Sequence, residues 1–191
     1  MLLKFKKAGC TRLHIGVESG NDKVLEALQK TINVKMVRKA FALCNKHNMD
    51  TMAYFIVGNP GETLKEAHDT INLAIEINPT FAQFSRMTPF PATKLYDMGI
   101  EKKIISHDYW KEFAEDPTKP VSPQFWTEHF TQDELTELAD YATQKFYVRP
   151  GYIFRTFMKL RTLDDFLQKF KTGVALIYSG KTYTKFKLKM V

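Results

Sequence analysis

Two stretches decide the fold of this 191-residue chain, His14-Ile15-Gly16-Val17-Glu18-Ser19-Gly20 and Ile56-Val57-Gly58-Asn59-Pro60-Gly61-Glu62-Thr63. In each, an apolar strand pattern leads into a turn that contains glycine, and a glutamate stands at or just past the end of the strand. A helix pattern follows each turn. In repeated strand–helix units the chemistry gathers at the carboxyl ends of the strands. Two such glutamates therefore predict a shared cleft.

Three strands are predicted. Residues 12–18 alternate between a face packed under helices and a face turned toward a cavity. The packed face holds Leu13, Ile15 and Val17, and the other face holds His14, Gly16 and Glu18. Residues 52–57 form a near-continuous apolar run, which is typical of a central parallel strand covered on both faces. Residues 81–87 alternate again and end at Thr88-Pro89-Phe90-Pro91, which cannot continue a ladder.

Helix signals separate these strands. Asn33 opens a helix that is predicted to run to about Lys46, and Cys44 lies on its apolar stripe. Thr63 and Glu66 match a capping box at the start of another helix. The order of strands and helices predicts an α/β fold with a parallel sheet.

Composition limits the class of protein. A hydrophobic content of 44% and 15 phenylalanines favour a folded globule. No apolar run is long enough to span a membrane, and the first residues lack the apolar core of a signal peptide. We therefore expect a cytoplasmic location. The only two cysteines, Cys10 and Cys44, have no partner at metal-ligand spacing, so no metal site is predicted from this chain.

Charge divides the chain unevenly. Residues 1–144 hold 17 lysines and arginines against 19 aspartates and glutamates, whereas residues 145–191 hold 11 against 2. This change indicates a separate basic element. We predict barrel-type strand–helix units over residues 1–93, an irregular, proline-interrupted connection over 94–131, and a basic helical region over 132–191. Helices are expected in that last region at about 132–148, 151–159 and 163–176.

Glu18 and the turn at residues 58–61 are open to two interpretations. The carboxylate of Glu18 can accept hydrogen bonds from a ribose diol beside the open backbone of Gly16, or it can pair with a nearby lysine. The turn can approach a flat ligand closely because glycine has no Cβ, or it can be simple turn chemistry. The helix that follows directs amide groups toward the same cleft.

No complete catalytic set is recognised, so the catalytic residues are left unassigned. In the basic region, lysines and arginines alternate with aromatic residues from Phe146 to Arg161. This composition can bind nucleic acid or an anionic membrane surface. Helical spacing also allows the aromatic residues to pack inward while the cations are solvated, and this interpretation is favoured.

Three motifs in order resemble the latter half of a radical S-adenosylmethionine (SAM) domain. They are Ala8-Gly9-Cys10 through Ser19-Gly20, then Phe55 through Thr63, then Thr88-Pro89-Phe90-Pro91-Ala92-Thr93. The likeness is greatest to the subgroup with an amino-terminal cobalamin-binding domain, which includes the anaerobic magnesium-protoporphyrin cyclase type. The segment from Phe146 to Tyr152 is similar to the carboxyl-terminal region of that subgroup. The resemblance covers nearly the whole chain.

The resemblance implies a partial (β/α) barrel with parallel strands and a carboxyl-terminal helical extension. In this family a [4Fe–4S] cluster holds SAM, and the 5′-deoxyadenosyl radical formed from it abstracts hydrogen from a substrate. The implied SAM-binding residues are Gly16, Glu18, Ser19, Gly58, Asn59, Pro60, Gly61, Glu62 and Pro89. Cobalamin-dependent methyl transfer or cyclisation of a small or lipophilic molecule would be the outcome.

The sequence departs from the family pattern at the cluster. The Cys-x3-Cys-x2-Cys run and the Gly-Gly-Glu-type strand are absent, and Cys10 and Cys44 cannot supply the several thiolates that a cluster needs. Ala92 stands where the family often has glycine. We therefore expect a carboxyl-terminal half that is inactive alone. It would be completed by an amino-terminal half, in cis or as a partner, that brings the cluster and any cobalamin.

An unpaired strand edge at residues 12–18 follows from this expectation. Two other functions stay open. One is a module that uses the basic region to bind nucleic acid or an anionic membrane, although nucleic acid is disfavoured. The other is a complete small α/β enzyme that binds a nucleotide-like ligand with Glu18 and the turn at residues 58–61.

Overall fold

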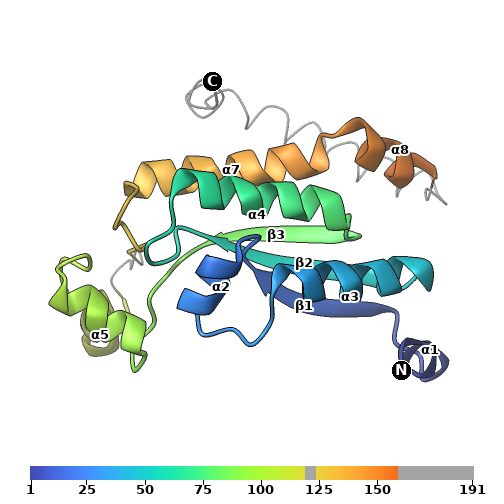
Figure 1. The fold of residues 1–191 in the computed structure, drawn as a ribbon. Helices are drawn as coiled ribbons and strands as arrows, with labels where there is room; N and C mark the ends of the chain where they lie inside the picture. The colour runs from blue at the N-terminus through green and yellow to red at the C-terminus, as the bar shows by residue number, and fades with distance from the viewer. Residues whose placement is uncertain (119–123, 159–191) are drawn as a thin grey trace.

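A three-stranded parallel sheet lies at the centre of the chain (Figure 1). The computed structural model describes residues 1–118 and 124–158. Its elements in chain order are α1 (Leu2–Lys7), β1 (Arg12–Glu18), α2 (Asp22–Ala27), α3 (Val34–Lys46), β2 (Asp50–Val57), α4 (Leu64–Ile77), β3 (Phe81–Arg86), α5 (Lys94–Glu101), α6 (Tyr109–Glu115), α7 (Gln132–Tyr147) and α8 (Pro150–Met158). The predicted α/β class and the parallel sheet are confirmed, and the structure is consistent with part of a (β/α) barrel.

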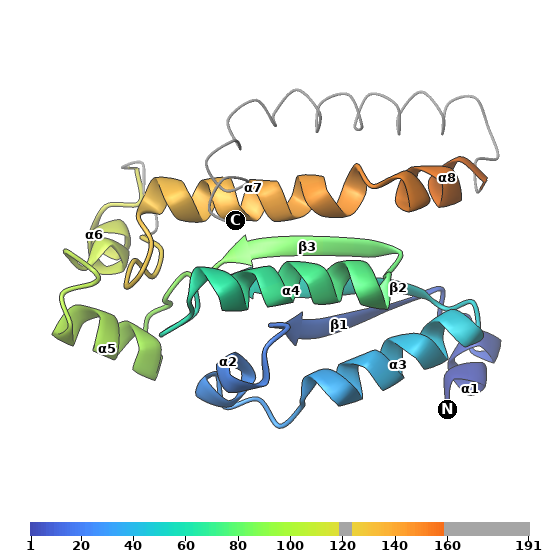
Figure 2. The same ribbon diagram turned by 45° about the horizontal axis from the view of Figure 1, so that its top comes forward.

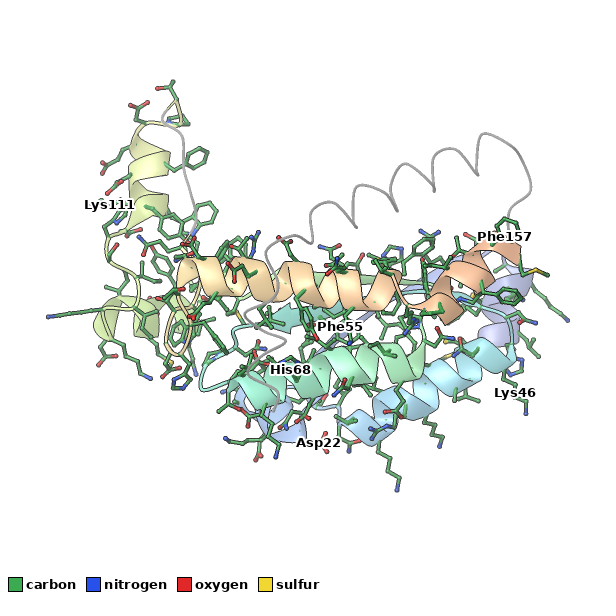
Figure 3. All side chains as sticks on the ribbon, turned by 90° about the horizontal axis from the view of Figure 1, so that it is seen from above. Asp22, Lys46, Phe55, His68, Lys111 and Phe157 are labelled. Carbon is green, nitrogen blue, oxygen red and sulfur yellow. The ribbon has the colours of Figure 1, made fainter. Side chains whose placement is uncertain are left out.

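Helices α3, α4 and α7 cover one face of this sheet (Figures 1 and 2). The core between them contains Phe41 from α3, Ile71 from α4, Phe146 from α7 and Phe55 from β2. Seen from above, Phe55 lies between α4 and α7 (Figure 3). Each of these side chains is at most 2% exposed, so the helices are fixed to the sheet by buried apolar area.

The other face of the sheet is not covered by helices of the described chain. Along β2, fully buried residues alternate with half-buried ones, which include Met52, Tyr54 and Ile56. The prediction that this strand is covered on both faces is therefore wrong. Both faces carry apolar side chains, but within residues 1–118 and 124–158 only the face toward α3, α4 and α7 is covered by helices. His14 and Gly16 of β1 are exposed on the open face, as the alternation predicted.

The start signals of the two long helices are confirmed. Asn33 accepts a hydrogen bond from the Met36 amide at the start of α3. Thr63 and Glu66 form the predicted capping box at the start of α4. Cys44 is buried on the apolar stripe of α3, where burial raises the pKa of its thiol.

The connection between residues 94 and 131 is more regular than predicted. It contains α5 and α6, which pack around Tyr96, Ile105 and Tyr109 in a small cluster of their own. The prolines at 117, 120 and 123 that suggested irregular structure follow these helices rather than interrupt them. Helix α1 was not predicted at all. The predicted helix at residues 163–176 lies outside the described residues, and the division into three parts stays a prediction.

The outer edges of the two edge strands, β1 and β3, have different neighbours. At β3, the hydroxyl of Tyr147 accepts a hydrogen bond from the Ala82 amide (3.0 Å) and donates to the Ala82 carbonyl (2.8 Å). The Tyr152 hydroxyl donates to the Thr80 carbonyl just before the strand (3.2 Å). The end of α7 therefore covers the outer edge of β3. No strand of the described chain lies beyond β1, which pairs only with β2.

Gly20 is required by close packing between the β1–α2 turn and α4. A Cβ at this position would lie 2.5 Å from the Asp69 carbonyl oxygen and 2.6 Å from the Thr70 Cα. Both are backbone atoms, so neither can rotate away. We expect Gly20→Ala to lower the free energy of unfolding by about 1–3 kcal/mol, measured by urea denaturation.

Gly151→Ala is the matched control, because a Cβ there meets nothing within 4 Å. This variant should unfold at the same urea concentration as the wild type or slightly higher, since alanine favours the helix. Equal stability of Gly20→Ala and Gly151→Ala would contradict the close packing of the turn on α4.

Candidate functional site at the carboxyl edge of the sheet

The three predicted motifs meet at one edge of the sheet. Because the strands are parallel and pair in the order β1-β2-β3, their carboxyl ends lie at the same edge. The Met87 amide donates to the Val57 carbonyl (2.9 Å), which ties the segment after β3 to the turn after β2. The structure thus brings Glu18, the turn at residues 58–62 and Pro89 to the same edge.

Glu18 is placed by a break in the regular strand. The register between β1 and β2 shifts between Gly16 and Glu18, and the backbone of Glu18 has a φ of +67°, in the left-handed region. Such a conformation costs on the order of 1–3 kcal/mol outside glycine and is often found at binding sites. The break turns the side chain back over the open face of the sheet, where a Cβ on Gly16 would lie 2.6 Å from Glu18 Oε1.

The carboxylate of Glu18 has one close cationic partner. Lys30 Nζ donates to Glu18 Oε1 at 2.8 Å, and the side chain of Glu18 is 15% exposed. Glu18 therefore has the features that both interpretations require. It pairs with a lysine, and it also lies beside the open backbone of Gly16. The other oxygen, Oε2, can accept a hydrogen bond from a ligand.

Ser19 has a structural environment. It is fully buried, its Oγ lies 3.1 Å from Thr70 Oγ1, and it accepts a hydrogen bond from the Asn21 amide. These bonds attach the turn after β1 to α4. Ser19 therefore supports the position of Glu18, and its hydroxyl is occupied within the protein.

Glu62 is also an internal residue of its turn. Its side chain is fully buried, and its Oε2 accepts hydrogen bonds from the amides of Gly58 (2.6 Å) and Asn59 (3.0 Å). Asn59 Nδ2 donates to the other oxygen, Oε1 (3.2 Å). Burial raises the pKa of Glu62 to about 7, against the opposing effect of these donors. The two glutamates at the strand ends therefore differ: Glu18 faces the open side, and Glu62 holds the turn together.

The remaining turn residues shape the edge. Gly58 and Gly61 both have positive φ, and Pro60 is half-buried. The Gly61 amide donates to Glu128 Oε2 (2.8 Å), so the connection after α6 also secures this turn. Asn59 Oδ1 is buried and has no hydrogen-bond partner among the described residues.

Pro89 is held by two aromatic residues of α6. The Tyr109 hydroxyl (3.2 Å) and Trp110 Nε1 (3.3 Å) both donate to the Pro89 carbonyl. Three residues later, Ala92 has a φ of +59°, a conformation that favours glycine. The turn nevertheless forms with alanine at this position.

Sequence reasoning missed several residues at this edge and on the open face. Lys30 and Glu128 reach the site from outside the motifs, and no local pattern marks them. Tyr54 could have been found from the sequence, because it occupies an open-face position in β2. In the structure its hydroxyl lies 2.7 Å from His14 Nδ1.

A separate hollow of about 500 Å³ lies among α2, α3 and α4, away from these motifs. Its lining includes Asp22, Asp69 and the ion pair of Arg38 with Glu76, in which Arg38 Nε lies 2.6 Å from Glu76 Oε1. Neither Glu18 nor the turn at residues 58–62 lines it. It is therefore not part of the candidate site.

The first 74 residues match the family model of the radical SAM superfamily. The radical SAM resemblance is confirmed. The chain is 28% identical over 150 residues to an uncharacterized methyltransferase of Pyrococcus horikoshii, covering 78% of this chain and 32% of the relative. It is 29% identical over 150 residues to the anaerobic magnesium-protoporphyrin IX monomethyl ester cyclase of Cereibacter sphaeroides, covering 78% of this chain and 23% of the relative.

A third relative is also a methyltransferase by name. The chain is 27% identical over 108 residues to the bacteriochlorophyllide d C-12(1)-methyltransferase of Chlorobaculum tepidum, covering 56% of this chain and 23% of the relative. The chain thus spans about a third or less of each of these radical SAM relatives.

The residues fit SAM but not its iron–sulfur cluster. The carboxylate of Glu18 beside Gly16 is an acceptor at the strand ends, of the kind that can bind the hydroxyl or ammonium groups of SAM. No group of three metal-ligating side chains occurs in residues 1–118 and 124–158, and the whole sequence has two cysteines. Cys10 is half-buried, and Cys44 is buried in α3.

The cations at the start of the basic region serve the fold. Arg149 donates to the Ile75 carbonyl (3.0 Å) and to Asn78 Oδ1 (2.7 Å). Arg155 donates to the carbonyls of Asn78 (3.1 Å) and Pro79 (2.8 Å). Both cap the end of α4, where carbonyl groups lack helical partners. These two arginines are not available for phosphate contacts, which weakens the case for nucleic-acid binding.

Glu62 gives the site a pH dependence. Because its pKa is about 7 in the folded chain and near 4.5 when unfolded, the folded state binds more protons between these values. This stabilisation is fully present below pH 4.5 and is lost as the pH rises to about 7, at a cost on the order of 3 kcal/mol. Glutamine does not titrate, so the Glu62→Gln variant lacks this pH dependence. As the pH rises from 5 to 7.5 the wild type loses stability from this group and the variant does not, so the free energy of unfolding of the variant should rise relative to that of the wild type.

The measurement is urea denaturation of both proteins at half-unit steps of pH. The comparison between proteins is needed because burial lowers the pKa of His68, which gives the opposite slope near pH 6.5. Glu26→Gln, on the exposed surface of α2, is the control and should follow the wild type. Parallel curves for Glu62→Gln and the wild type would mean that Glu62 does not titrate in this range.

Proposed function

We propose that this chain is the carboxyl part of a radical SAM enzyme and that it holds SAM at the carboxyl edge of β1, β2 and β3. The observation that carries the proposal is the position of Glu18. A register shift and a left-handed backbone turn its carboxylate over Gly16 at the same edge as the Gly58–Glu62 turn. A strained residue at the end of a barrel strand is expected where a ligand is bound.

Each segment has a separate role in this proposal. The carboxylate of Glu18 accepts hydrogen bonds from the ribose hydroxyls or the ammonium group of SAM, and Lys30 fixes its orientation. The backbone from Gly58 to Gly61 lies against the adenine, and the segment at Pro89 closes the same side. Ser19 and Glu62 do not need to touch SAM, because they hold the two turns in place. SAM, when reductively cleaved, supplies the radical chemistry of this superfamily.

The cluster that reduces SAM would be provided by residues outside this chain. We propose that a segment with three closely spaced cysteines pairs with the free edge of β1, either in cis or as a separate polypeptide. On this proposal the chain alone is inactive. A cobalamin-binding domain would be part of the same missing portion, as the resemblance implies.

The reaction belongs to one of two classes. The relatives named above are methyltransferases and a cyclase that forms a ring in a magnesium porphyrin ester. Methyl transfer or ring formation on a small or lipophilic molecule is therefore proposed for the whole enzyme. The open face with Tyr54, Met52 and Ile56 offers a mixed apolar and polar surface for such a substrate.

The proposal predicts a loss of SAM affinity when Glu18 is neutralised. The chain is coexpressed with the coding sequence upstream of it, the cluster is reconstituted with iron and sulfide, and SAM binding is measured by equilibrium dialysis. Glu18→Gln should weaken binding by about tenfold to a hundredfold, since hydrogen bonds to a charged group contribute about 1.5–3 kcal/mol. Formation of 5′-deoxyadenosine should fall in parallel.

Glu26→Gln again serves as the control and should bind SAM like the wild type. Two results would contradict the proposal. One is a reconstituted cluster that forms without any cleavage of SAM. The other is unchanged SAM affinity in Glu18→Gln, which would leave the family intact but remove the role assigned to this carboxylate.

A further inference from the structure

The open face of the sheet carries a hydrogen-bonded pair of side chains from two strands. His14 Nδ1 lies 2.7 Å from the Tyr54 hydroxyl, and the ring centroids are 5.8 Å apart. If Tyr54 donates to Nδ1, neutral His14 carries its hydrogen on Nε2. If Nδ1 donates instead, the hydroxyl hydrogen of Tyr54 is directed elsewhere. In either tautomer the pair therefore keeps one polar hydrogen that can donate to a ligand.

A guanidinium lies over the same part of this face. Met52 pairs with His14 on one side and with Phe81 on the other, so these three residues form one row across the sheet, the open-face row. Arg12 Cζ lies 4.3 Å from the centroid of the Phe81 ring. A guanidinium that lies on a ring keeps its N–H donors at its edge. Arg12 thus brings donors to one end of the row, and the His14–Tyr54 pair brings a donor to the other end.

These groups indicate the chemistry of a ligand. Donors beside a guanidinium suit an anionic oxygen, and arginine matches the geometry of a carboxylate in particular. Asp50 is paired with Arg12 in the register, and it accepts a hydrogen bond from Thr80 Oγ1 (3.1 Å). A guanidinium has five N–H donors, so one acidic neighbour does not exhaust them. With an aspartate nearby, Arg12 suits the single charge of a carboxylate better than the nearly double charge of a phosphate monoester.

The floor of the row is apolar. Met52 and Phe81 are half-buried, and so is Ile56 further along β2 on the same face. The two ends of the row are about 10 Å apart, because each strand adds about 4.8 Å. A carboxylate above Met52 is therefore within reach of side chains from both ends, and the rest of the ligand lies on apolar groups.

The row lies next to the Glu18 end of the face. Tyr54 pairs with Gly16, and the carboxylate of Glu18 lies over Gly16. Paired strands are only about 4.8 Å apart. A ligand held by Tyr54 and a SAM molecule held by Glu18 would therefore lie side by side, as two reacting molecules must.

We propose that the open-face row binds the carboxylate of a lipophilic substrate. The His14–Tyr54 pair donates a hydrogen bond to this carboxylate, and Arg12 pairs with its charge. The identification of the ligand as a substrate rests on the proposed SAM site. Binding of a carboxylate at the row does not.

The test compares decanoate, decanol and decylammonium, which share an alkyl chain and differ in the head group. Each is titrated into the 191-residue chain labelled with ¹³C-histidine. The Cε1–Hε1 signal of His14, identified by its absence in His14→Gln, is followed by NMR. Decanoate should shift this signal in a saturable way, and the other two probes should bind at least tenfold more weakly. Tyr54→Phe and Arg12→Gln should each weaken decanoate binding by about tenfold, and circular dichroism checks their fold.

Lys39→Gln is the matched control for the loss of a cation, because Lys39 is exposed on α3, which covers the other face of the sheet. It should bind decanoate like the wild type. Equal affinity for decanoate and decanol, an unshifted His14 signal, or unchanged affinity in both Tyr54→Phe and Arg12→Gln would overturn the proposal. Decanoate binding is measured without SAM or a cluster. Its loss therefore leaves the SAM site untouched, and unchanged SAM affinity in Glu18→Gln leaves the carboxylate site intact.

Discussion

The constraint on which this structure depends is that both edge strands of a parallel sheet carry backbone groups that need hydrogen-bond partners. At β3 the hydroxyl of Tyr147 supplies both partners for Ala82, and it does so from the end of α7. At β1 the described chain supplies no neighbouring strand. The edge at β3 is thus closed by a side chain, and the edge at β1 has backbone groups that a further parallel strand can pair with.

The position of the site follows from the same arrangement. Glu18 lies at the end of the edge strand, where the pairing of β1 with β2 shifts in register and the backbone is left-handed. Behind it, Ser19 and Gly20 fasten the turn to α4, and the close approach at Gly20 excludes a side chain. The site is therefore built from a strained residue on a rigid support.

Much of this arrangement is encoded locally and could be predicted. Strand alternation gave the faces of β1, the capping box gave the start of α4, and the order of elements gave a parallel sheet. The features that could not be predicted depend on long-range packing. The apolar run in β2 does not reveal that its second face is only half-buried and has no helix over it in the part of the chain that the structure describes. The partners Lys30 of Glu18 and Glu128 of Gly61 are distant or unmarked in sequence. The buried role of Glu62 follows from turn geometry that a motif alone does not specify.

The free edge of β1 is tested most directly by hydrogen–deuterium exchange of backbone amides. In the isolated chain, the outward-facing amides of β1 should exchange fast while those of β3 are protected. Coexpression with the upstream segment should protect β1 and leave β3 unchanged. Equal protection of both edges in the isolated chain, or a β1 that stays unprotected in the assembled protein, would contradict this account.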